Sequence, residues 1–416
     1  MFSKFSIENF KSIKDRITLD MNATNITGLE KNLIDLGSNK LLKSISIIGP
    51  NASGKSNLLN GFVIMRHLVI DSAKNIQAKE LLPIEPFRLN LTSETQPSLF
   101  EVELILGNKT FVYGFRADAE KVYHEWLIQK LKTTTKKIFT RENNTFSYDK
   151  SWKENKSLER FLRNNALFLS VAAQWNIPLA AEIVEWFMSI NTLHGLSFQQ
   201  YANISINLME DKETRPLIIE LMKKADLGIE NMKVEPTKSK QDLVNRVKNE
   251  YNKEVSKFLS KKNFYDVLTY HSKYNDGGEK VGDEEFNLSI EESDGTRKFF
   301  SMIGAILEAF IKGELVIIDE FDARLHPDLV NEVINLFNSA SNKQGQLICV
   351  NFNTGVLNNK LLRRDQIYLI EKDHYGSSKL NSMVEYNIRK GQPMEKHYRE
   401  GRVGGKPTIE DFQAIF

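Results

Sequence analysis

The sequence predicts an α/β protein, and three segments support this prediction. The first is a short apolar strand, Ser46–Ile48, followed by a glycine-rich loop and the start of a helix. The second is a pair of alternating segments, Phe100–Leu106 and Thr110–Phe115, separated by the turn residues Gly107-Asn108. The third is the apolar run Leu315–Ile318, which is followed by two carboxylates. Together they indicate a mixed sheet with helices and an antiparallel β lobe.

The loop after the first strand has the complete phosphate-loop pattern G-x-x-x-x-G-K-S. Glycines let successive backbone N–H groups point at one anion, and the helix that follows adds the positive end of its dipole. We expect Lys55 to reach the β- and γ-phosphates of a nucleotide from an exposed loop, with its ammonium outside the core, and Ser56 to hold Mg²⁺. The residues predicted to bind the nucleotide here are Gly49, Pro50, Asn51, Ala52, Ser53, Gly54, Lys55, Ser56 and Asn57.

The composition places few limits on partners. A chain of 416 residues can bury a large core and form two or three lobes. With 56 basic and 54 acidic residues, the net charge of +2 neither requires nor excludes nucleic acid. The chain has a single cysteine, Cys349, which excludes a disulfide or a cysteine-based zinc site. Cys349 lies in an apolar run and is expected in the core. Apolar runs are too short to span a membrane and no signal peptide is visible, so we expect a cytoplasmic protein.

The other elements follow in chain order. Residues 1–48 alternate like a β-ribbon that leads into the loop, and the helix after the loop has a mostly apolar face. A third strand is expected at Val122–Leu131, after the hairpin. Over residues 172–263 the apolar positions change to helical spacing. Strands are expected again near Tyr265–His271 and Phe286–Ile290.

Part of the helical segment is basic. Lys238–Lys262 contains eight Lys or Arg and three Asp or Glu residues. Two interpretations remain open, a solvated helix face and a surface for nucleic acid or a partner protein. The second predicts that Lys248, Lys253, Lys257 and Lys261 contribute to binding of duplex DNA.

The apolar run in the last third of the chain ends in a second nucleotide-site motif (Walker B). Asp319 lies at the end of the predicted strand, where its carboxylate can support Mg²⁺. Glu320 follows and is positioned to orient and deprotonate an attacking water. Shortly before, Ser293 opens a helix whose apolar residues repeat up to Gly313. By itself Ser293 is a helix N-cap, but its position before the acidic strand also fits a nucleotide-site signature.

The order of these motifs resembles ABC-type ATPases of the SMC/RecF kind: phosphate loop, Ser293-Asp294-Gly295 signature, acidic strand, then Phe321–Pro327. Further segments resemble one bacterial group, the stand-alone AAA-domain ATPases of phage-defence and restriction-linked operons, such as RloA, the AbiL ATPase and the ATPase of PARIS. These segments are Ile7–Ile13, Pro86–Leu89, Ala166–Gln174, Leu361–Ile367, Glu371–Asp373 and Gly401–Gly404.

The resemblance implies an ABC-type ATPase head with a helical insertion. Its parts would be residues 1–171 with the phosphate loop and β lobe, 172–264 as the insertion, and 265–416 with the signature, the acidic strand and the loop after it. ATP and Mg²⁺ are the implied cofactors. Members of such families pair two heads, so Ser293 and Gly295 would act on the γ-phosphate of a partner copy. Asp322 would lie in the loop that crosses between the two sites.

One departure from the family pattern concerns the strand at Gln346–Val350. The family continues with Thr-His, and the histidine contacts the γ-phosphate. Here the sequence is Asn351-Phe352-Asn353-Thr354, so Phe352 takes that position. Phenylalanine cannot donate a hydrogen bond to phosphate. We therefore expect slow hydrolysis, or a contact from Asn353 if the register is shifted by one residue.

The function that the resemblance implies is an ATPase sensor that dimerises, or forms a larger oligomer, on ATP and engages DNA or a phage component. It would control a separate effector in phage defence, such as a nuclease encoded nearby. The chain after Val350 is too short for the Toprim nuclease domain of OLD-type relatives. Two alternatives remain: a RecF-like repair ATPase that binds DNA directly, and a scaffold that binds ATP without hydrolysing it.

Overall fold

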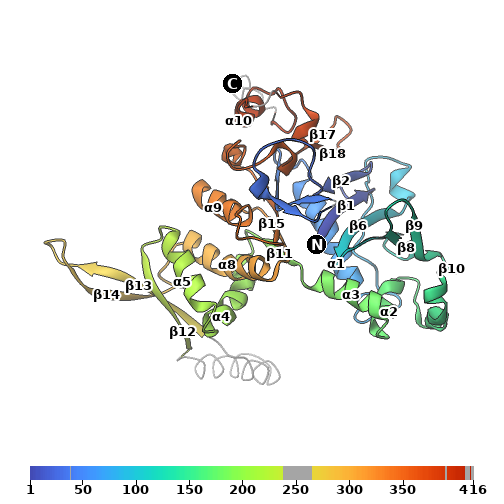
Figure 1. The fold of residues 1–416 in the computed structure, drawn as a ribbon, viewed down its shortest axis with the longest axis horizontal. Coiled ribbons are helices and arrows are strands. Elements are labelled where there is room, and N and C mark those ends of the chain that lie inside the picture. The colour runs from blue at the N-terminus through green and yellow to red at the C-terminus, as the bar shows by residue number, and fades with distance from the viewer. Residues whose placement is uncertain (38, 238–264, 389–390, 408–412, 414–416) are drawn as a thin grey trace. The chain divides into compact units, whose positions relative to one another are not determined.

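The computed structural model describes most of the chain, and these residues divide into two compact units (Figure 1). The first unit comprises Met1–His194, Ala309–Asp322 and Val330–Phe416, and the second Gly195–Glu308 and Ala323–Leu329. The described residues are 1–37, 39–237, 265–388, 391–407 and 413. The predicted DNA-binding lysines, Lys248, Lys253, Lys257 and Lys261, lie outside them.

A mixed sheet of six strands forms the centre of the first unit, as far as the structure describes it. Five strands are parallel, and β18 pairs antiparallel with β17 at one edge. Both β5 and β15 are buried along their whole length. Strands covered on both faces favour continuous apolar runs, which explains the sequence Leu315–Ile318 of β15. In spatial order the strands are β11 (Asn191–His194), β15 (Leu315–Asp319), β16 (Gln346–Asn351), β5 (Ser44–Ile48), β17 (Ile367–Lys372) and β18 (Ser378–Ser382).

The predicted antiparallel β lobe is the second large sheet of this unit. The expected hairpin is confirmed as β6–β7, with Leu106 opposite Lys109, and the expected third strand is β8. The predicted N-terminal ribbon is β1–β2, which joins this sheet through β6. In spatial order the strands are β10 (Thr145–Tyr148), β9 (Thr135–Glu142), β8 (Val122–Lys130), β7 (Lys109–Ala117), β6 (Ser98–Leu106), β1 (Phe2–Glu8) and β2 (Ile17–Asp20). A separate pair is β3 (Leu33–Asp35) and β4 (Lys40–Leu42).

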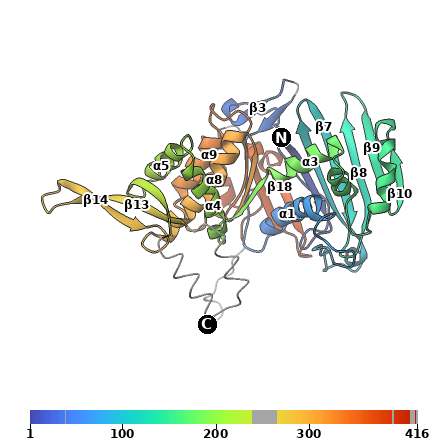
Figure 2. The same cartoon turned by 90° about the horizontal axis from the view of Figure 1, so that it is seen from below.

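Helix α1 (Lys55–Asp71) lies between the two large sheets and joins them into one core (Figure 2). Its Phe62 ring meets the rings of Phe2 and Phe5 edge-on, at centroid distances of 5.8 and 5.2 Å. A Cβ on Gly61 would lie 2.2 Å from the terminal methyl carbon of Ile7, so any larger residue would require that side chain to move. This packing anchors the helix that begins directly after the phosphate loop. Helices α2 (Phe168–Gln174) and α3 (Pro178–Met188) follow in the same core.

The second unit combines helices with a three-stranded antiparallel sheet. The hairpin of β13 and β14 extends beyond the helices of this unit (Figure 1). The predicted strand at Phe286–Ile290 is misplaced, because the turn at Asn275 closes with the Gly278 N–H on the Asn275 carbonyl at 2.9 Å and pairing resumes at once. The second unit contains the elements η4 (Phe198–Tyr201), α4 (Ala202–Glu210), α5 (Arg215–Lys224), β12 (Ile229–Pro236), β13 (Tyr265–Tyr274) and β14 (Lys280–Asn287).

Two helices cross the division between the units, α8 (Asp294–Lys312) and α9 (Pro327–Phe337). The span 172–263, predicted as helical, also contains strands β11 and β12. Both strands are short, so their alternating apolar residues were not distinguished from the helical spacing around them. Cys349 is buried, as predicted. Within the described ranges, no helix could cross a membrane. The remaining elements are α10 (Met394–Arg399) and the 3₁₀ helices η1 (Glu30–Asn32), η2 (Ser93–Thr95), η3 (Lys150–Phe161), η5 (Thr354–Val356), η6 (Arg364–Gln366) and η7 (Met383–Glu385).

Candidate functional site

The phosphate loop connects the end of β5 to the start of α1, as the sequence predicted. Gly54 has φ 106°, a left-handed conformation that glycine adopts without strain. A Cβ on Gly54 would lie 2.1 Å from the Ser378 hydroxyl oxygen, and one on Gly49 would lie 2.1 Å from the Ile370 carbonyl oxygen. Both glycines are therefore required because β17 and β18 pack directly against the loop.

A network of serine side chains, which the sequence did not reveal, supports the phosphate loop on the side where β18 packs. The Ser378 hydroxyl donates to the Ser53 carbonyl at 2.7 Å and lies 2.8 Å from the Ser12 hydroxyl. The Asn57 amide donates to the same Ser12 oxygen at 2.8 Å. Ser12 lies in a segment that resembles the family, but nothing in the sequence pattern singled out Ser378. These contacts hold the backbone of the loop in its curled shape.

Lys55 is buried, with only 4% of its surface exposed, so the expectation of an ammonium outside the core is wrong. Its ammonium donates to the carbonyls of Gly49 and Pro50 at 2.7 and 2.8 Å. The Phe352 ring lies over it, with the nitrogen 4.2 Å from the ring centroid, a cation–π distance. Burial lowers the pKa of Lys55 below its usual range.

Three carboxylates oppose this shift of the Lys55 pKa, those of Asp319, Asp322 and Glu320. The negative charge of each of them raises the pKa of Lys55 and so favours its charged form. The two sequence motifs therefore meet around one lysine in the first unit, and the acidic motif compensates part of the charge that the phosphate loop buries.

Asp319 and Glu320 follow β15 as predicted. Asp319 is buried, and one of its carboxylate oxygens accepts the backbone N–H of Glu320 at 3.0 Å. Glu320 is half-buried and has φ 49°, a left-handed conformation that costs a residue with a side chain about 1–2 kcal/mol. Strain of this kind persists where the surrounding structure imposes it, and it is concentrated at functional sites.

The sheet explains why these motifs meet. Strands β15, β16, β5 and β17 are parallel neighbours, with Ile318 opposite Cys349 and Asn351 opposite Ile48. The carboxyl ends of parallel strands lie at one edge, where ligands bind in open α/β sheets. The phosphate loop, the Asp319-Glu320 pair and the Phe352 loop therefore share the same edge.

Asp322 contacts the loop that contains Phe352. One carboxylate oxygen accepts the backbone N–H groups of Phe352 and Asn353 at 2.8 and 2.6 Å. The Asn353 side chain accepts the Gly355 N–H at 2.8 Å and caps the short helix η5. Asp322 thus fixes the backbone from which the Phe352 ring reaches Lys55. Its predicted contact with a partner copy remains a prediction.

The signature residues lie in the second unit. The Ser293 hydroxyl accepts the Thr296 N–H at 3.1 Å, which confirms the N-cap interpretation for α8. Asp294 accepts a hydrogen bond from Arg324 at 2.9 Å. A Cβ on Gly295 would lie 2.9 Å from the Arg324 carbonyl, so the glycine allows the loop after the acidic strand to approach. Contact of Ser293 and Gly295 with a partner's γ-phosphate remains a prediction.

The residues predicted to hold Mg²⁺ supply the oxygen ligands that this ion prefers. Asp319 offers a carboxylate at the sheet edge, and Ser56 an exposed hydroxyl in the first turn of α1. In the part of the chain that the structure describes, no group of three or more His, Cys, Asp or Glu side chains could hold a metal by itself. A magnesium ion here would neutralise phosphate charge and take further ligands from phosphate and water. Ser53, beside the site, has a buried hydroxyl oxygen without a hydrogen-bond partner, which suits a polar ligand.

Comparison with known proteins decides the family. Residues 44–350 match the model of a family described as "AAA domain, putative AbiEii toxin, Type IV TA system". The chain belongs to this AAA-domain family. The match begins at β5 and ends in β16, so it includes both nucleotide motifs. No curated protein matches the sequence significantly.

Solved structures similar to this AAA-domain protein include SMC heads. The SMC head domain from Thermotoga maritima is 13% identical, with 92% of this chain and 98% of that chain covered and a TM-score of 0.41. An SMC head bound to the C-winged helix domain of ScpA is 12% identical, with 92% and 97% covered and a TM-score of 0.42. An SMC head from Pyrococcus furiosus bound to the C-terminal domain of ScpA is 13% identical, with 92% and 97% covered and a TM-score of 0.38.

We expect Phe352→His to raise ATP turnover. A preorganised donor to the reacting group is typically worth about 10²–10³ in rate, which sets the upper limit of the gain. The Phe352 side chain is 43% exposed and Asp322 fixes its backbone, so a histidine ring can take its place without repacking the core. Steady-state phosphate release with Mg²⁺ and ATP measures the effect.

Phe352→Leu is the matched control, because it removes the ring over Lys55 and adds no donor. A histidine variant that folds and binds ATP yet hydrolyses it no faster would show that the register assignment is wrong. If Phe352→Leu accelerates ATP hydrolysis as much as Phe352→His does, the faster turnover results from removing the ring over Lys55 and not from a new donor.

Proposed function

We propose that this AAA-domain protein is a Mg²⁺-dependent ATPase whose heads pair when ATP is bound. The observation that supports this best is the shared sheet edge, where Lys55, Glu320 and Asp322 belong to one electrostatic cluster. A phosphate loop alone would suit many nucleotide-binding proteins. A carboxylate directly beyond a buried Walker B strand suits hydrolysis, because water needs a base near the γ-phosphate.

Each residue of the site has a separate proposed role in binding or hydrolysis. Lys55 exchanges the carbonyls of Gly49 and Pro50 for the β- and γ-phosphates, and the loop N–H groups bind the same oxygens. Glu320 accepts a proton from the water that attacks the γ-phosphorus, and the bond to the bridging oxygen of ADP breaks. Because the Phe352 ring lies over Lys55, nucleotide entry requires that ring to move.

We further propose that head pairing regulates a separate effector in defence against phage. The family description names a putative toxin of a toxin–antitoxin system, which is compatible with such a partner. Ser293 and Gly295 of one copy would then cover the nucleotide of the other. The N-cap bond of Ser293 to Thr296 leaves its hydroxyl hydrogen for a phosphate oxygen, if the bond to the Thr296 hydroxyl is exchanged.

Purified wild-type protein tests the proposal. We expect it to bind ATP in the presence of Mg²⁺, to release phosphate slowly, and to double its mass by light scattering with ATP but not with ADP. Absence of nucleotide binding would exclude the ATPase. Binding without any increase in mass would exclude head pairing and leave the ATPase in place.

A further inference from the structure

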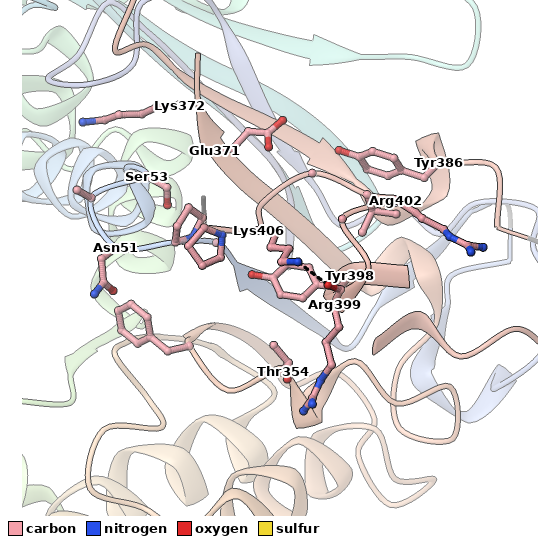
Figure 3. A pocket seen from close by; sticks show the side chains of 18 residues that line it. Asn51, Ser53, Thr354, Glu371, Lys372, Tyr386, Tyr398, Arg399, Arg402 and Lys406 are labelled. Atoms are coloured by element: carbon pink, nitrogen blue, oxygen red, sulfur yellow. Dashed lines mark hydrogen bonds between the residues drawn. The ribbon is translucent and has the colours of Figure 1, made fainter. Parts of the chain in front are cut away.

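A cavity of about 1470 Å³ adjoins the phosphate loop and is larger than a triphosphate requires. One wall is the first half of the loop, Gly49–Ser53, together with Phe352. The opposite wall is the C-terminal segment Tyr398–Pro407, which no nucleotide motif includes (Figure 3). All these residues belong to the first unit.

Specific contacts hold this segment in place. The Glu371 carboxylate, near the end of β17, accepts the Gly405 N–H at 2.8 Å, and the Tyr398 hydroxyl donates to the Gly405 carbonyl at 2.6 Å. A Cβ on Gly404 would lie 2.7 Å from the Tyr386 hydroxyl and 2.8 Å from Glu371. Because β17 pairs with the strand that precedes the phosphate loop, these contacts fix the segment relative to the loop.

Cationic side chains line the cavity, namely Lys372, Arg399, Arg402 and Lys406. Arg399 is paired with Glu395 at 2.7 Å and Arg402 with Glu400 at 2.9 Å. The Lys406 ammonium instead donates to the neutral carbonyl of Arg399 at 2.7 Å. An ammonium has three N–H donors, so this bond leaves capacity for an anion. In Figure 3 Lys406 lies centrally, whereas the ends of Lys372 and Arg402 point outward.

Phe352, which follows β16, lies where this cavity begins, and its side chain cannot hydrogen-bond phosphate. We propose that Lys406 binds the γ-phosphate across the cavity and makes the site discriminate ATP from ADP. The inference rests on the proposed nucleotide function. It makes the C-terminal segment part of the nucleotide site, with Lys406 as a specificity-determining residue.

A purely structural role is the competing explanation. Arg399 ends α10, and a lysine ammonium on a terminal carbonyl stabilises a helix end by itself. This role predicts a lower melting temperature for Lys406→Gln and unchanged nucleotide affinities. The γ-phosphate role predicts a change in affinity that depends on the third phosphate.

The test measures the Kd of ADP and of a non-hydrolysable ATP analogue by calorimetry with Mg²⁺. For Lys406→Gln we expect the Kd of the analogue to rise about 10- to 100-fold, as for loss of a charged hydrogen bond, and the Kd of ADP to change less than about twofold. Lys406→Arg should retain most of the discrimination. Lys372→Gln is the matched control, because it removes the same charge from the same cavity and should leave both Kd values unchanged.

An unchanged ratio of the two Kd values in Lys406→Gln would overturn the inference, as would equal weakening of both nucleotides. The same loss in Lys372→Gln would also overturn it, because general charge would then explain the effect. In each of these cases wild-type binding leaves the proposed function standing. Failure of the wild-type protein to bind either nucleotide would overturn both.

Discussion

Glu320→Gln is expected to slow ATP hydrolysis by about 10²–10⁴-fold, the usual contribution of a general base. The substitution keeps the size of the side chain and removes only its ability to accept a proton. Glutamine tolerates the left-handed backbone at this position as well as glutamate does, so the fold should not change. Single-turnover phosphate release with excess protein measures the chemical step directly.

The same variant is expected to accumulate with ATP bound, which should enrich paired heads in light scattering. Glu332→Gln is the control, because it removes the same charge from the exposed face of α9. If Glu320→Gln hydrolyses ATP at the rate of the wild type, another residue is the general base. Normal ATP trapping without an increase in mass would contradict the shared-site arrangement.

Lys55→Ala is expected to weaken ATP binding by about 2–4 kcal/mol, or ~30- to 1000-fold in Kd, because it removes the buried cation that we propose contacts the phosphates. Calorimetric titration with ATP measures the loss. ATP affinity equal to that of the wild type would contradict the phosphate-loop assignment.

Burial of Lys55 makes a stability control necessary. The ammonium donates to two loop carbonyls, and alanine leaves both without this partner. Lys55→Met keeps the apolar stem, fills the space beneath the Phe352 ring and still lacks the charge. Equal loss of ATP binding in both variants, at unchanged melting temperature, would separate the phosphate contact from packing.

The sequence alone predicted the elements whose signal is local. The phosphate loop needs its glycines and lysine at set spacing, and the hairpin at Gly107 follows from strand alternation around turn residues. The apolar run before Asp319 indicates a buried strand, and parallel neighbours are buried in this way. Each of these patterns spans few residues, so one chain segment contains all the information.

Strand order and contacts between distant residues were decided only in the tertiary structure. Ser12 and Ser378, 366 residues apart, meet beneath Gly54 because β18 folds back beside the phosphate loop. Local pattern placed Lys55 in an exposed loop, whereas the Phe352 ring, from a strand end far along the chain, covers it.

The C-terminal wall of the cavity shows the same limit. The sequence around Lys406 has neither apolar periodicity nor a phosphate motif, and the resemblance of Gly401–Gly404 to ATPases assigns Lys406 no contact with a nucleotide. Its position depends on the hydrogen bond from Gly405 to Glu371, which in turn depends on β17 lying next to β5. Short-range patterns therefore predicted single elements such as the phosphate loop, the β6–β7 hairpin and β15, whereas only the packing of the sheet determines which elements share an edge.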